Sequence, residues 1–518
     1  MTLKKFSQEI ISLILSDKIS SKKQLNSFKL KLAKKYSLKD FPSNPAILSF
    51  AKNKKPELVK LLLIKPVRSL SGIVSVAITP KPLPCPGKCI YCPSSLVDVK
   101  TPKSYTGREP TTMRAIANDF DAVKQIRNRI DQLKRNGHST QKIELIIMGG
   151  TFLSASFKCQ KQFMLDCFNA VNKTKSFSLE KAIDKAQFSE NRFIGITFET
   201  RPDFCGKKEI NHMLEFGGTR VELGVQTLND EIYKKINRNH SVQDVINSTS
   251  LLRDSSFKFA YHLMPGLPYS TPKEDLRVFK KTFSDPDFKP DMLKIYPCLV
   301  IKNTELHDLW KKGDYTPYSS KQAAKLIAKM KSFVPKYTRI MRIQRDIPST
   351  VVSAGVKHTN LRQLIEKEME KHDWKCNCIR CREIGRTIES NQEPKIEVLE
   401  YSASKGKEFF ISLETKNSLY GFCRMRFPFN PFRKEITSKT ALIRELHIYS
   451  KSLPLNNSPK ENEFQHKGFG KKLMQKAEEI ALENSFNKIN VISGIGAREY
   501  YWNLGFKNDG VYVSKKLN

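Results

Sequence analysis

Three cysteines, Cys85, Cys89 and Cys92, stand close together with Cys-x3-Cys-x2-Cys spacing, just past a stretch of β-branched residues. Three thiolates on one loop can hold three irons of a 4Fe-4S cube and leave the fourth iron open to another ligand. A zinc site normally needs four protein ligands, and the sequence offers no fourth one nearby. The spacing therefore favours an iron-sulfur cluster with one open iron over a zinc site.

A second group, Cys376, Cys378 and Cys381, has Cys-x-Cys-x2-Cys spacing in a highly charged stretch. Clustered thiolates among basic residues suit zinc, with the fourth position filled by water, by a histidine such as His372 or by a remote side chain. Reduced surface thiols are the alternative. The other five of the 11 cysteines are scattered, which is typical of small buried side chains: Cys159, Cys167, Cys205, Cys298 and Cys423.

Two glycine-containing segments can bring the backbone close to a ligand. Gly149 and Gly150 directly follow a predicted strand, where a glycine pair by itself indicates a tight turn. A second run starts at Gln465, includes Gly468 and Gly470, and opens into a predicted helix. The free N–H groups at a helix start can bind a phosphate, and the glycines permit a close approach. A strand precedes this run and another follows its helix, but the pattern taken alone is weak, and a simple glycine-rich helix cap is the alternative.

The elements that must hold these groups follow from hydrophobic periodicity. Between residues 71 and 362, short β-rich runs alternate with amphipathic helices, which predicts βα units and a parallel sheet, open or barrel-like. In such a sheet the functional groups gather at the carboxyl ends of the strands. The predicted strands are residues 73–78, 142–148, 193–199, 220–225, 258–264 and 292–296.

Composition divides the chain into four parts, with an α/β fold class overall. Residues 1–70 form a basic helical region, and 71–362 form the parallel α/β domain. Residues 363–393 are highly charged and hold the second cysteine group, so they resemble a linker rather than a core. Residues 394–518 form a separate α+β domain, with strands at 396–401, 409–413, 421–426, 441–449 and 488–492 and a helix at 469–483.

A formal net charge of +38 makes an acidic polymer the leading partner. Residues 1–68 alone hold 16 Lys or Arg against four Asp or Glu, although solvated helix faces would have the same composition. Charge alone does not separate tRNA from DNA, ribosomes or anionic lipid. No apolar run approaches the roughly 18 residues of a spanning helix, and the N-terminus lacks the pattern of a signal peptide. We therefore expect a cytoplasmic protein without a membrane partner.

Six motifs in one collinear order resemble the catalytic subunit of Elongator, and the resemblance runs from about residue 60 to the C-terminus. In that family a radical S-adenosylmethionine (SAM) domain, a partial (β/α) barrel, precedes a GNAT-type acetyltransferase domain. Many members have a longer insert between the first two cluster cysteines, so the compact spacing of Cys85 and Cys89 puts the loop shape in doubt. The motifs are residues 104–115 (SYTGREPTTMRA), 148–152 (MGGTF), 199–203 (ETRPD), 222–226 (ELGVQ), 342–348 (RIQRDIP) and 444–447 (RELH).

The resemblance implies a tRNA uridine(34) acetyltransferase that uses a 4Fe-4S cluster, SAM and acetyl-CoA. A SAM-derived radical would abstract hydrogen from the acetyl methyl group, and the carbon radical would add to C5 of the wobble uridine in the anticodon stem-loop. Thioester hydrolysis would then leave a carboxymethyl group. Elongator-like protein partners or self-association are also implied. A protein lysine acetyltransferase with a structural iron-sulfur domain and an RNA-binding scaffold with inactive sites are the alternatives.

The resemblance also assigns roles to single residues. Gly149, Gly150 and Glu222 would bind the cofactor in the radical domain, and Arg238 and Arg345 would hold tRNA phosphates. Lys142, Tyr500 and Tyr501 would be catalytic, with Lys142 and Tyr501 also contacting acetyl-CoA. The remaining acetyl-CoA residues would be Glu445, Leu446, His447, Ile448, Gly468, Phe469, Gly470 and Lys471.

Overall fold

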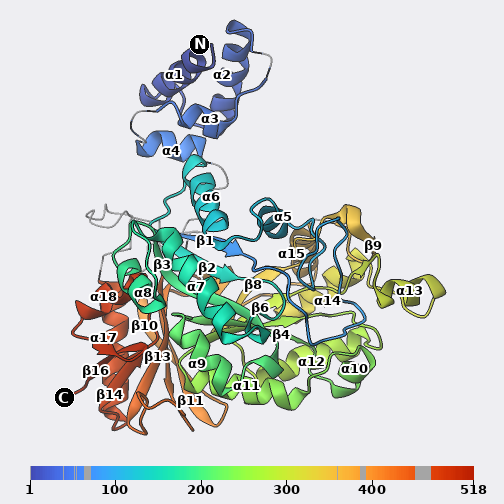
Figure 1. Cartoon of the computed structure of the whole chain (residues 1–518), viewed down its shortest axis with the longest axis vertical. Helices are drawn as coiled ribbons and strands as arrows, with labels where there is room; N and C mark the ends of the chain where they lie inside the picture. Colours follow the sequence, from blue (N-terminus) through green and yellow to red (C-terminus); the bar gives the residue numbers. More distant parts are fainter. Residues whose placement is uncertain are drawn as a thin grey trace.

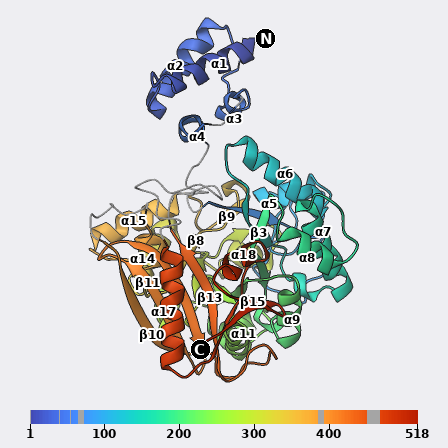
Figure 2. The same ribbon diagram turned by 90° about the vertical axis from the view of Figure 1, so that its left-hand side faces the viewer.

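The computed structural model describes residues 2–518 apart from Lys39, Lys52, Lys54, Thr359 and the segments 64–71, 385–392 and 450–467. The described chain forms a small helical unit, a parallel α/β domain and a mixed-sheet domain (Figure 1). The helical unit stands at one end of the molecule in both views, while the two sheets lie against each other (Figure 2). Among the described residues, no helix has the length and apolar character needed to cross a membrane.

The helical unit has an apolar core of its own. Phe6, Ile10 and Ile14 recur at helical spacing on α1 and are buried against residues of the other three helices, including Leu25 and Leu58. The lysines of α1 and α2 lie almost entirely on the exposed side. The predicted basic helices are therefore present as α1 (Thr2–Leu15), α2 (Lys22–Lys35), α3 (Asn44–Leu48) and α4 (Pro56–Leu62).

The parallel sheet is open and seven-stranded, in agreement with the predicted partial barrel. Its strands pair in the order β1 (Ile73–Ile78), β2 (Lys142–Ile147), β3 (Arg192–Thr200), β4 (Arg220–Gln226), β5 (Lys258–Leu263), β6 (Met292–Ile295) and β8 (Arg339–Ile343), all parallel. β8 was not predicted, because two arginines and a methionine obscure its alternation. A separate antiparallel pair is formed by β7 (Val300–Ile301) and β9 (Val352–Ala354).

The two faces of the parallel sheet differ in chemistry. On β2, Ile143, Leu145 and Ile147 are buried in the main core, whereas Glu144 lies on the other face, which is only half-buried. The core face packs against helices, and the inner face carries polar groups. The helices of this domain are α5 (Pro110–Ile116), α6 (Ala122–Arg135), α7 (Phe157–Val171), α8 (Leu179–Ala186), α9 (Lys207–Glu215), α10 (Asp230–Lys235), α11 (Val242–Asp254), α12 (Pro272–Ser284), α13 (Glu305–Lys312), α14 (Ser320–Lys331) and α15 (Leu361–Lys371).

The C-terminal sheet is antiparallel except for one parallel pair, β13 with β14. These two strands pair only from Thr440 opposite Lys488 to Ile443 opposite Val491, so the later part of β13 has no strand on that side in the described chain. Helix α17 (Phe469–Glu483) packs on one face. The strand order is β10 (Lys395–Ala403), β11 (Gly406–Glu414), β12 (Leu419–Phe427), β13 (Thr440–Ile448), β14 (Lys488–Val491), β16 (Tyr512–Lys516) and β15 (Lys507–Asp509), and α18 (Arg498–Trp502) precedes β15.

The segment expected to be a linker packs instead into the core over much of its length. Leu361, Ile365 and Met369 of α15 are buried in the main core, because the charged residues of this helix occupy only its outer face. The following short helix α16 (Ile379–Arg382) is fixed by a hydrogen bond from the Ile379 amide to the Thr338 carbonyl, 3.0 Å long. The charged residues of this segment therefore lie on the exposed face of α15, and the helix is not an exposed linker.

Buried charges join the two sheets. Strand β12 is buried on both faces: Cys423 and Met425 face α17, while Arg424 and Arg426 face the parallel domain. Arginines on this side and on the neighbouring strand pair with acidic groups of both domains. We call this set the interface ion cluster: Arg253, Asp254, Asp291, Glu408, Arg424, Arg426, Arg444 and Glu445.

Glu408 is a central anion of the interface ion cluster. Its Oε1 lies 3.1 Å from Arg253 and from Arg426, and its Oε2 lies 2.8 Å from Arg444. Burial by itself raises the pKa of Glu408, but the three arginines more than reverse this and hold it below its ordinary value of 4.5. The carboxylate therefore contributes stability above about pH 4.5, and the contribution is lost as the pH falls toward the folded-state pKa.

Replacing Glu408 with Gln should lower the free energy of unfolding by about 3–5 kcal/mol, because it leaves buried guanidinium groups without their anion. The loss of stability on acidification below about pH 4.5 should also become shallower than in the wild type. Urea unfolding at pH 7 and at several acidic pH values measures both effects. Glu231→Gln, which removes an exposed partner of Lys234, is the control and should leave stability unchanged. Equal stability of Glu408→Gln and wild type would contradict the structural role of the cluster.

Candidate functional site

The first cysteine loop is anchored by the residues between its ligands. The Ile90 amide donates to the Ile236 carbonyl at 3.2 Å, and the Leu306 amide donates to the Ile90 carbonyl at 3.0 Å. Ile90 and Tyr91 are buried in an apolar cluster, whereas Cys85, Cys89 and Cys92 are half-buried. The loop follows β1, so the three thiols lie at the carboxyl end of the parallel sheet, as predicted.

The three thiols fit an iron-sulfur cluster. Burial raises the pKa of the Cys92 thiol to about 11, and the nearby Cys89 and Cys85 add to the rise. A thiol in such a place becomes a ligand only when a cationic centre stabilises its thiolate form. Three thiolates on a partly open loop match a cluster that keeps one iron accessible.

The glycine pair lies at the same end of the sheet. Gly149 and Gly150 follow β2 with φ of 127° and 82°, backbone conformations that favour glycine. A Cβ on Gly149 would lie 3.2 Å from Pro80, and one on Gly150 would lie 3.3 Å from the Lys103 carbonyl oxygen. Residues with a side chain would be strained at both positions. The two glycines therefore allow the backbone after β2 to pack closely against its neighbours.

Five charged side chains inside the parallel sheet form a continuous series of contacts, here called the charge ladder: Glu144, Arg220, Glu222, Lys294 and Glu199. Arg220 Nη1 lies 2.6 Å from Glu144 Oε1, and Arg220 Nη2 donates to Glu222 Oε1 at 3.3 Å. Lys294 Nζ pairs with Glu222 and lies 3.6 Å from Glu199 Oε1. Glu144 stands early in β2 and Glu199 late in β3, so the ladder crosses the sheet from its amino to its carboxyl end.

Glu222 is the centre of the charge ladder. Its side chain has no exposed surface, and His262 Nε2 also lies 2.9 Å from its Oε2. Burial alone would raise the pKa of Glu222, but Lys294, His262 and Arg220 hold it well below 4.5. The resemblance assigns cofactor binding to Glu222, whereas the structure surrounds it with protein partners. Glu199, Glu222 and His262 lie within 4.8 Å of one another as metal ligands can, but the Lys294 ammonium already supplies the cation there.

The carboxyl end of the charge ladder reaches the cysteine loop. Tyr105 Oη donates to Glu199 Oε2 at 2.9 Å, and the neighbouring Ser104 amide donates to the carbonyl of Pro93, the residue after Cys92. Arg345 Nη2 donates to the Ser104 carbonyl at 2.6 Å. Arg345, expected to hold a tRNA phosphate, therefore supports this segment.

The amino end of the ladder reaches a cavity of about 470 Å³ between the two sheets. This volume is in the range of small-molecule sites. Six Arg or Lys side chains and three Glu side chains line it, so its wall favours an anionic ligand. The charged lining residues are Glu144, Arg220, Lys258, Arg339, Arg380, Glu383, Arg424, Arg444 and Glu445.

Four of the predicted acetyl-CoA residues line this cavity, namely Glu445, Leu446, His447 and Tyr501. The first three belong to the part of β13 that has separated from β14, which leaves its backbone edge open on that side within the described chain. An open strand edge can pair with an extended ligand that carries amide groups.

The electrostatic state of the cavity wall follows from its neighbours. Burial raises the pKa of Glu445, but Lys258 and Arg424 more than reverse this and hold it at about 2. Burial lowers the pKa of His447 to about 4, so the imidazole is neutral at pH 7. Its Nε2 is buried without a hydrogen-bond partner among the described residues, which leaves a polar atom available to a ligand. Burial also raises the pKa of Tyr501, so its phenol stays protonated.

The other predicted acetyl-CoA residues gather at the start of α17. Gly468 precedes the helix with a φ of 76°, and Phe469, Gly470 and Lys471 form its first turn. The Tyr500 hydroxyl lies against Gly470, and Ile448 of β13 lies nearby. The structure thus brings Tyr500 to the helix start and Tyr501 to the cavity. Gln465 to Lys467, the first part of the glycine run, lie outside the described residues.

Lys142 begins β2 and pairs in register with Ile73, a residue of the cavity wall. Lys142 does not itself line the cavity. Its side chain is half-buried, and burial lowers the pKa of its ammonium group. The lysine therefore stands next to the cavity, on the strand that also carries Glu144.

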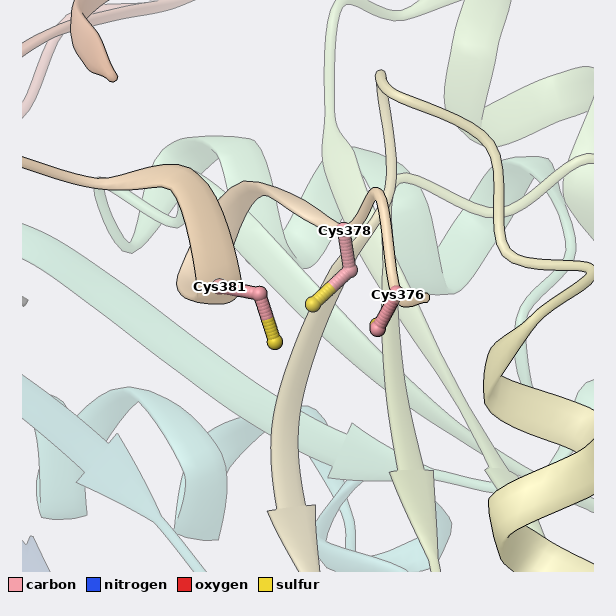
Figure 3. Close-up of side chains that lie close together, drawn as sticks. All are labelled: Cys376, Cys378 and Cys381. Atoms are coloured by element: carbon pink, nitrogen blue, oxygen red, sulfur yellow. The ribbon is translucent and has the colours of Figure 1, made fainter. Parts of the chain in front are cut away.

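The second cysteine group forms a compact trio. The sulfur atoms of Cys376, Cys378 and Cys381 lie within 4.8 Å of one another, and Figure 3 shows Cys381 on α16 and the other two cysteines on the segment that leads into it. His372, one candidate for a fourth ligand, is not grouped with the three sulfur atoms: its Nδ1 is 2.9 Å from the Glu368 carbonyl oxygen and its ring stacks on Trp374.

Several site residues were beyond the sequence analysis. Arg220 and Lys294 carry no motif of their own, and only their strands show which face they occupy. Arg238 was expected to hold a tRNA phosphate, but its side chain is buried and donates to the Gly224 carbonyl and to Cys89. Arg238 lies 12 residues after the 222–226 motif, and nothing in the sequence around it indicates contact with Cys89 or Gly224.

Four family profiles match the chain in order. The ELP3 N-terminal domain matches residues 3–70, and the Radical SAM superfamily matches 84–280. The Radical_SAM C-terminal domain matches 290–371, and the Acetyltransferase (GNAT) family matches 380–506. Together they span the helical unit, the parallel sheet and the C-terminal sheet.

Named relatives cover nearly the whole chain. The tRNA uridine(34) acetyltransferase of Methanocaldococcus jannaschii is 49% identical over 489 residues, 92% of this chain and 90% of that protein. Elongator complex protein 3 of Saccharomyces cerevisiae is 40% identical over 531 residues, 98% of this chain and 95% of that protein. The structure of Methanocaldococcus infernus Elp3 with an N-terminal deletion is 44% identical, with a TM-score of 0.77, and the match covers 86% of this chain and 100% of that one. The chain therefore belongs to the Elp3 family, whose members are named tRNA uridine(34) acetyltransferase or Elongator complex protein 3.

Proposed function

We propose that this protein is a tRNA uridine(34) acetyltransferase that builds a carboxymethyl group on C5 of the wobble uridine from acetyl-CoA, with SAM. The names of its relatives and the order of its radical SAM and GNAT domains support this activity. The observation that carries the proposal is the cavity whose wall both domains build and which the charge ladder joins to the cysteine loop. The shared wall lets acetyl-CoA held by the C-terminal domain contact side chains of the parallel domain.

The parallel domain provides the radical side of the reaction. When bound at Cys85, Cys89 and Cys92, a 4Fe-4S cluster with SAM supplies a 5'-deoxyadenosyl radical. The protein contributes orientation: Ile90 and Tyr91 anchor the loop. Gly149 and Gly150 leave room for the polar end of SAM to approach the backbone at the end of β2.

The C-terminal domain provides the acetyl-CoA side. Free N–H groups at the start of α17, from Gly468 to Lys471, would hold the pyrophosphate, with Tyr500 beside them. The open edge of β13 at residues 445–448 would pair with the pantetheine amides. The Tyr501 phenol, which stays protonated, can donate to the thioester carbonyl, and Lys142 stands at the rim for an anionic group of the same ligand.

The helical unit would hold the tRNA. Its exposed lysines form a basic surface that a phosphate backbone can follow, while the anticodon loop offers unstacked bases to the cavity. We also propose that the protein works in the cytoplasm on the anticodon stem-loop, alone or with Elongator-like partners.

The cysteine trio at 376–381 would hold zinc, with water or a remote side chain as the fourth ligand, and so stabilise one wall of the cavity. Arg380 lies within the trio's own segment, and Glu383 follows α16; both line the cavity. Glu383 accepts from Arg339 at 2.6 Å, and Arg339 also donates to Tyr449 of the C-terminal domain. Structural zinc sites contribute folding energy directly, which a four-residue helix needs.

Anaerobic incubation with tRNA, SAM, acetyl-CoA and a reductant should yield the carboxymethyl nucleoside, detected by mass spectrometry after digestion of the tRNA. Cys89→Ala should abolish the product and leave tRNA affinity unchanged, because only the cluster is lost. Cys159→Ala, which removes an exposed thiol of α7, is the matched control and should retain full activity. Product formed equally well without SAM would overturn the proposal, and SAM-independent acetylation of protein lysines would favour the lysine acetyltransferase alternative.

Cys378→Ser should reduce bound zinc from about one per chain to background, because the trio loses its buried ligand. Acetyl-CoA should then bind more weakly, since Arg380 and Glu383 lose their support. Elemental analysis and calorimetric titration with acetyl-CoA measure the two effects, with Cys159→Ser as control. Wild-type protein that binds no zinc would refute the metal assignment.

Converting Lys22, Lys23 and Lys34 to Glu should weaken tRNA binding and lower the salt dependence of the affinity by about one counterion per lost contact. Filter binding at several salt concentrations measures the slope. Lys321, Lys325 and Lys329, exposed lysines of α14, provide an equal charge change on another helix. If both triple variants lose affinity equally, the helical unit is not a specific tRNA surface.

A further inference from the structure

A buried arginine lies directly behind the first cysteine loop. Arg238 Nη1 donates to Cys89 Sγ at 3.5 Å, and its Nη2 donates to the Gly224 carbonyl. The residue is 8% exposed, and its Nε has no partner among the described residues. A Cβ on Gly224 would lie 2.8 Å from Arg238 Nη2, so the glycine makes room for the guanidinium.

Arg238 has no carboxylate partner in the part of the chain that the structure describes. A buried guanidinium without a counter-charge costs several kcal/mol, so an anion must lie within reach when the protein is functional. The neighbouring His240, packed on Tyr233 with its side chain fully buried, supplies neither an anion nor a further positive charge. Burial and the neighbouring Arg238 and Arg201 lower the pKa of His240 to about 2, which keeps the ring neutral.

A second arginine approaches the same loop. A Cβ on Gly87, between Cys85 and Cys89, would lie 2.0 Å from Arg201 Nη1. Arg201 is held by Asp203 at 2.8 Å, yet its Nη1 is buried without a partner among the described residues. Two guanidinium groups thus face the loop, and one of them contacts a ligand sulfur.

We propose that Arg238 is a positioning residue that holds Cys89 and makes the cluster easier to reduce, with Arg201 as a second buried cation behind the loop. This inference rests on the cluster of the proposed function. Reduction adds one electron from an external low-potential one-electron donor, and no bond breaks and no proton moves. The added negative charge spreads over the sulfurs, where a hydrogen bond and a nearby buried cation stabilise it.

The experiment is a redox titration of the anaerobically reconstituted full-length protein without SAM, followed by the electron paramagnetic resonance signal of the reduced cluster. In Arg238→Gln the ratio of reduced to oxidised cluster at the wild-type midpoint should fall about tenfold, which corresponds to a midpoint about 59 mV more negative. Arg238→Lys keeps the positive charge but loses the planar guanidinium that bonds to two acceptors, so its midpoint should shift less than that of Arg238→Gln. Lys88→Gln removes an exposed charge from the same loop and should leave the midpoint unchanged, because water screens it.

Iron and sulfide analysis accompanies every titration. A full cluster with an unchanged midpoint in Arg238→Gln overturns the inference and leaves the proposed function intact. A midpoint that moves equally in Lys88→Gln also overturns it, because any nearby charge would then suffice. If Arg238→Gln assembles no cluster, the test rests on Arg238→Lys, and an unchanged midpoint in that variant overturns the inference. Absence of a cluster in both variants shows that Arg238 only shapes the loop, which also overturns it. Absence of a cluster in the wild type refutes the proposed function itself.

Discussion

The pairing of buried arginines with carboxylates between the two sheets sets how the domains meet, and the cavity depends on that placement. Arg424, Arg426 and Arg444 point away from the apolar core under α17 and toward the parallel domain. A guanidinium removed from water needs an anion at a fixed distance and angle, which Asp291 and Glu408 provide. Apolar surfaces tolerate sliding, whereas a bidentate ion pair does not. The cavity can therefore be built from strands of two domains and still keep one shape.

The charge ladder is the second unusual use of buried charge. The interior of a closed α/β barrel is normally filled by layers of branched apolar side chains. Here Glu144, Arg220, Glu222, Lys294 and Glu199 occupy the inner face instead, and each carboxylate has a cationic partner. An apolar filling would be at least as stable. What the ladder adds is a fixed connection between the cysteine loop at one end of the strands and the cavity at the other.

Sequence patterns predicted the elements better than the site. Alternation predicted β1 with the bounds that the structure gives it, Ile73–Ile78, and located six of the parallel strands, because apolar residues on their core faces recur with period two. Alternation missed β8, which contains Arg339 of the cavity wall and Arg342 of the 342–348 motif. The high charge of residues 363–393 predicted a linker, because only one face of α15 is apolar. The cysteine and glycine motifs are local, so spacing alone found them. The cavity, the ladder and the interface ion cluster join residues far apart in the sequence, and no local pattern records such pairs.

The positively charged side chains of this protein serve two different purposes. Residues 1–68 hold 15 lysines and one arginine, and most of the lysines of α1 and α2 are exposed. The buried positive side chains of the interface ion cluster are all arginines. The two buried positive side chains described beside the cysteine loop, Arg201 and Arg238, are arginines as well. Lysine is a strongly hydrated point charge that suits a mobile polyanion, whereas the planar guanidinium loses less hydration and bonds in fixed directions. A single total of +38 therefore combines two kinds of charge. One faces solvent and can attract a nucleic acid, while the other is internal and orders the groups that carry the chemistry.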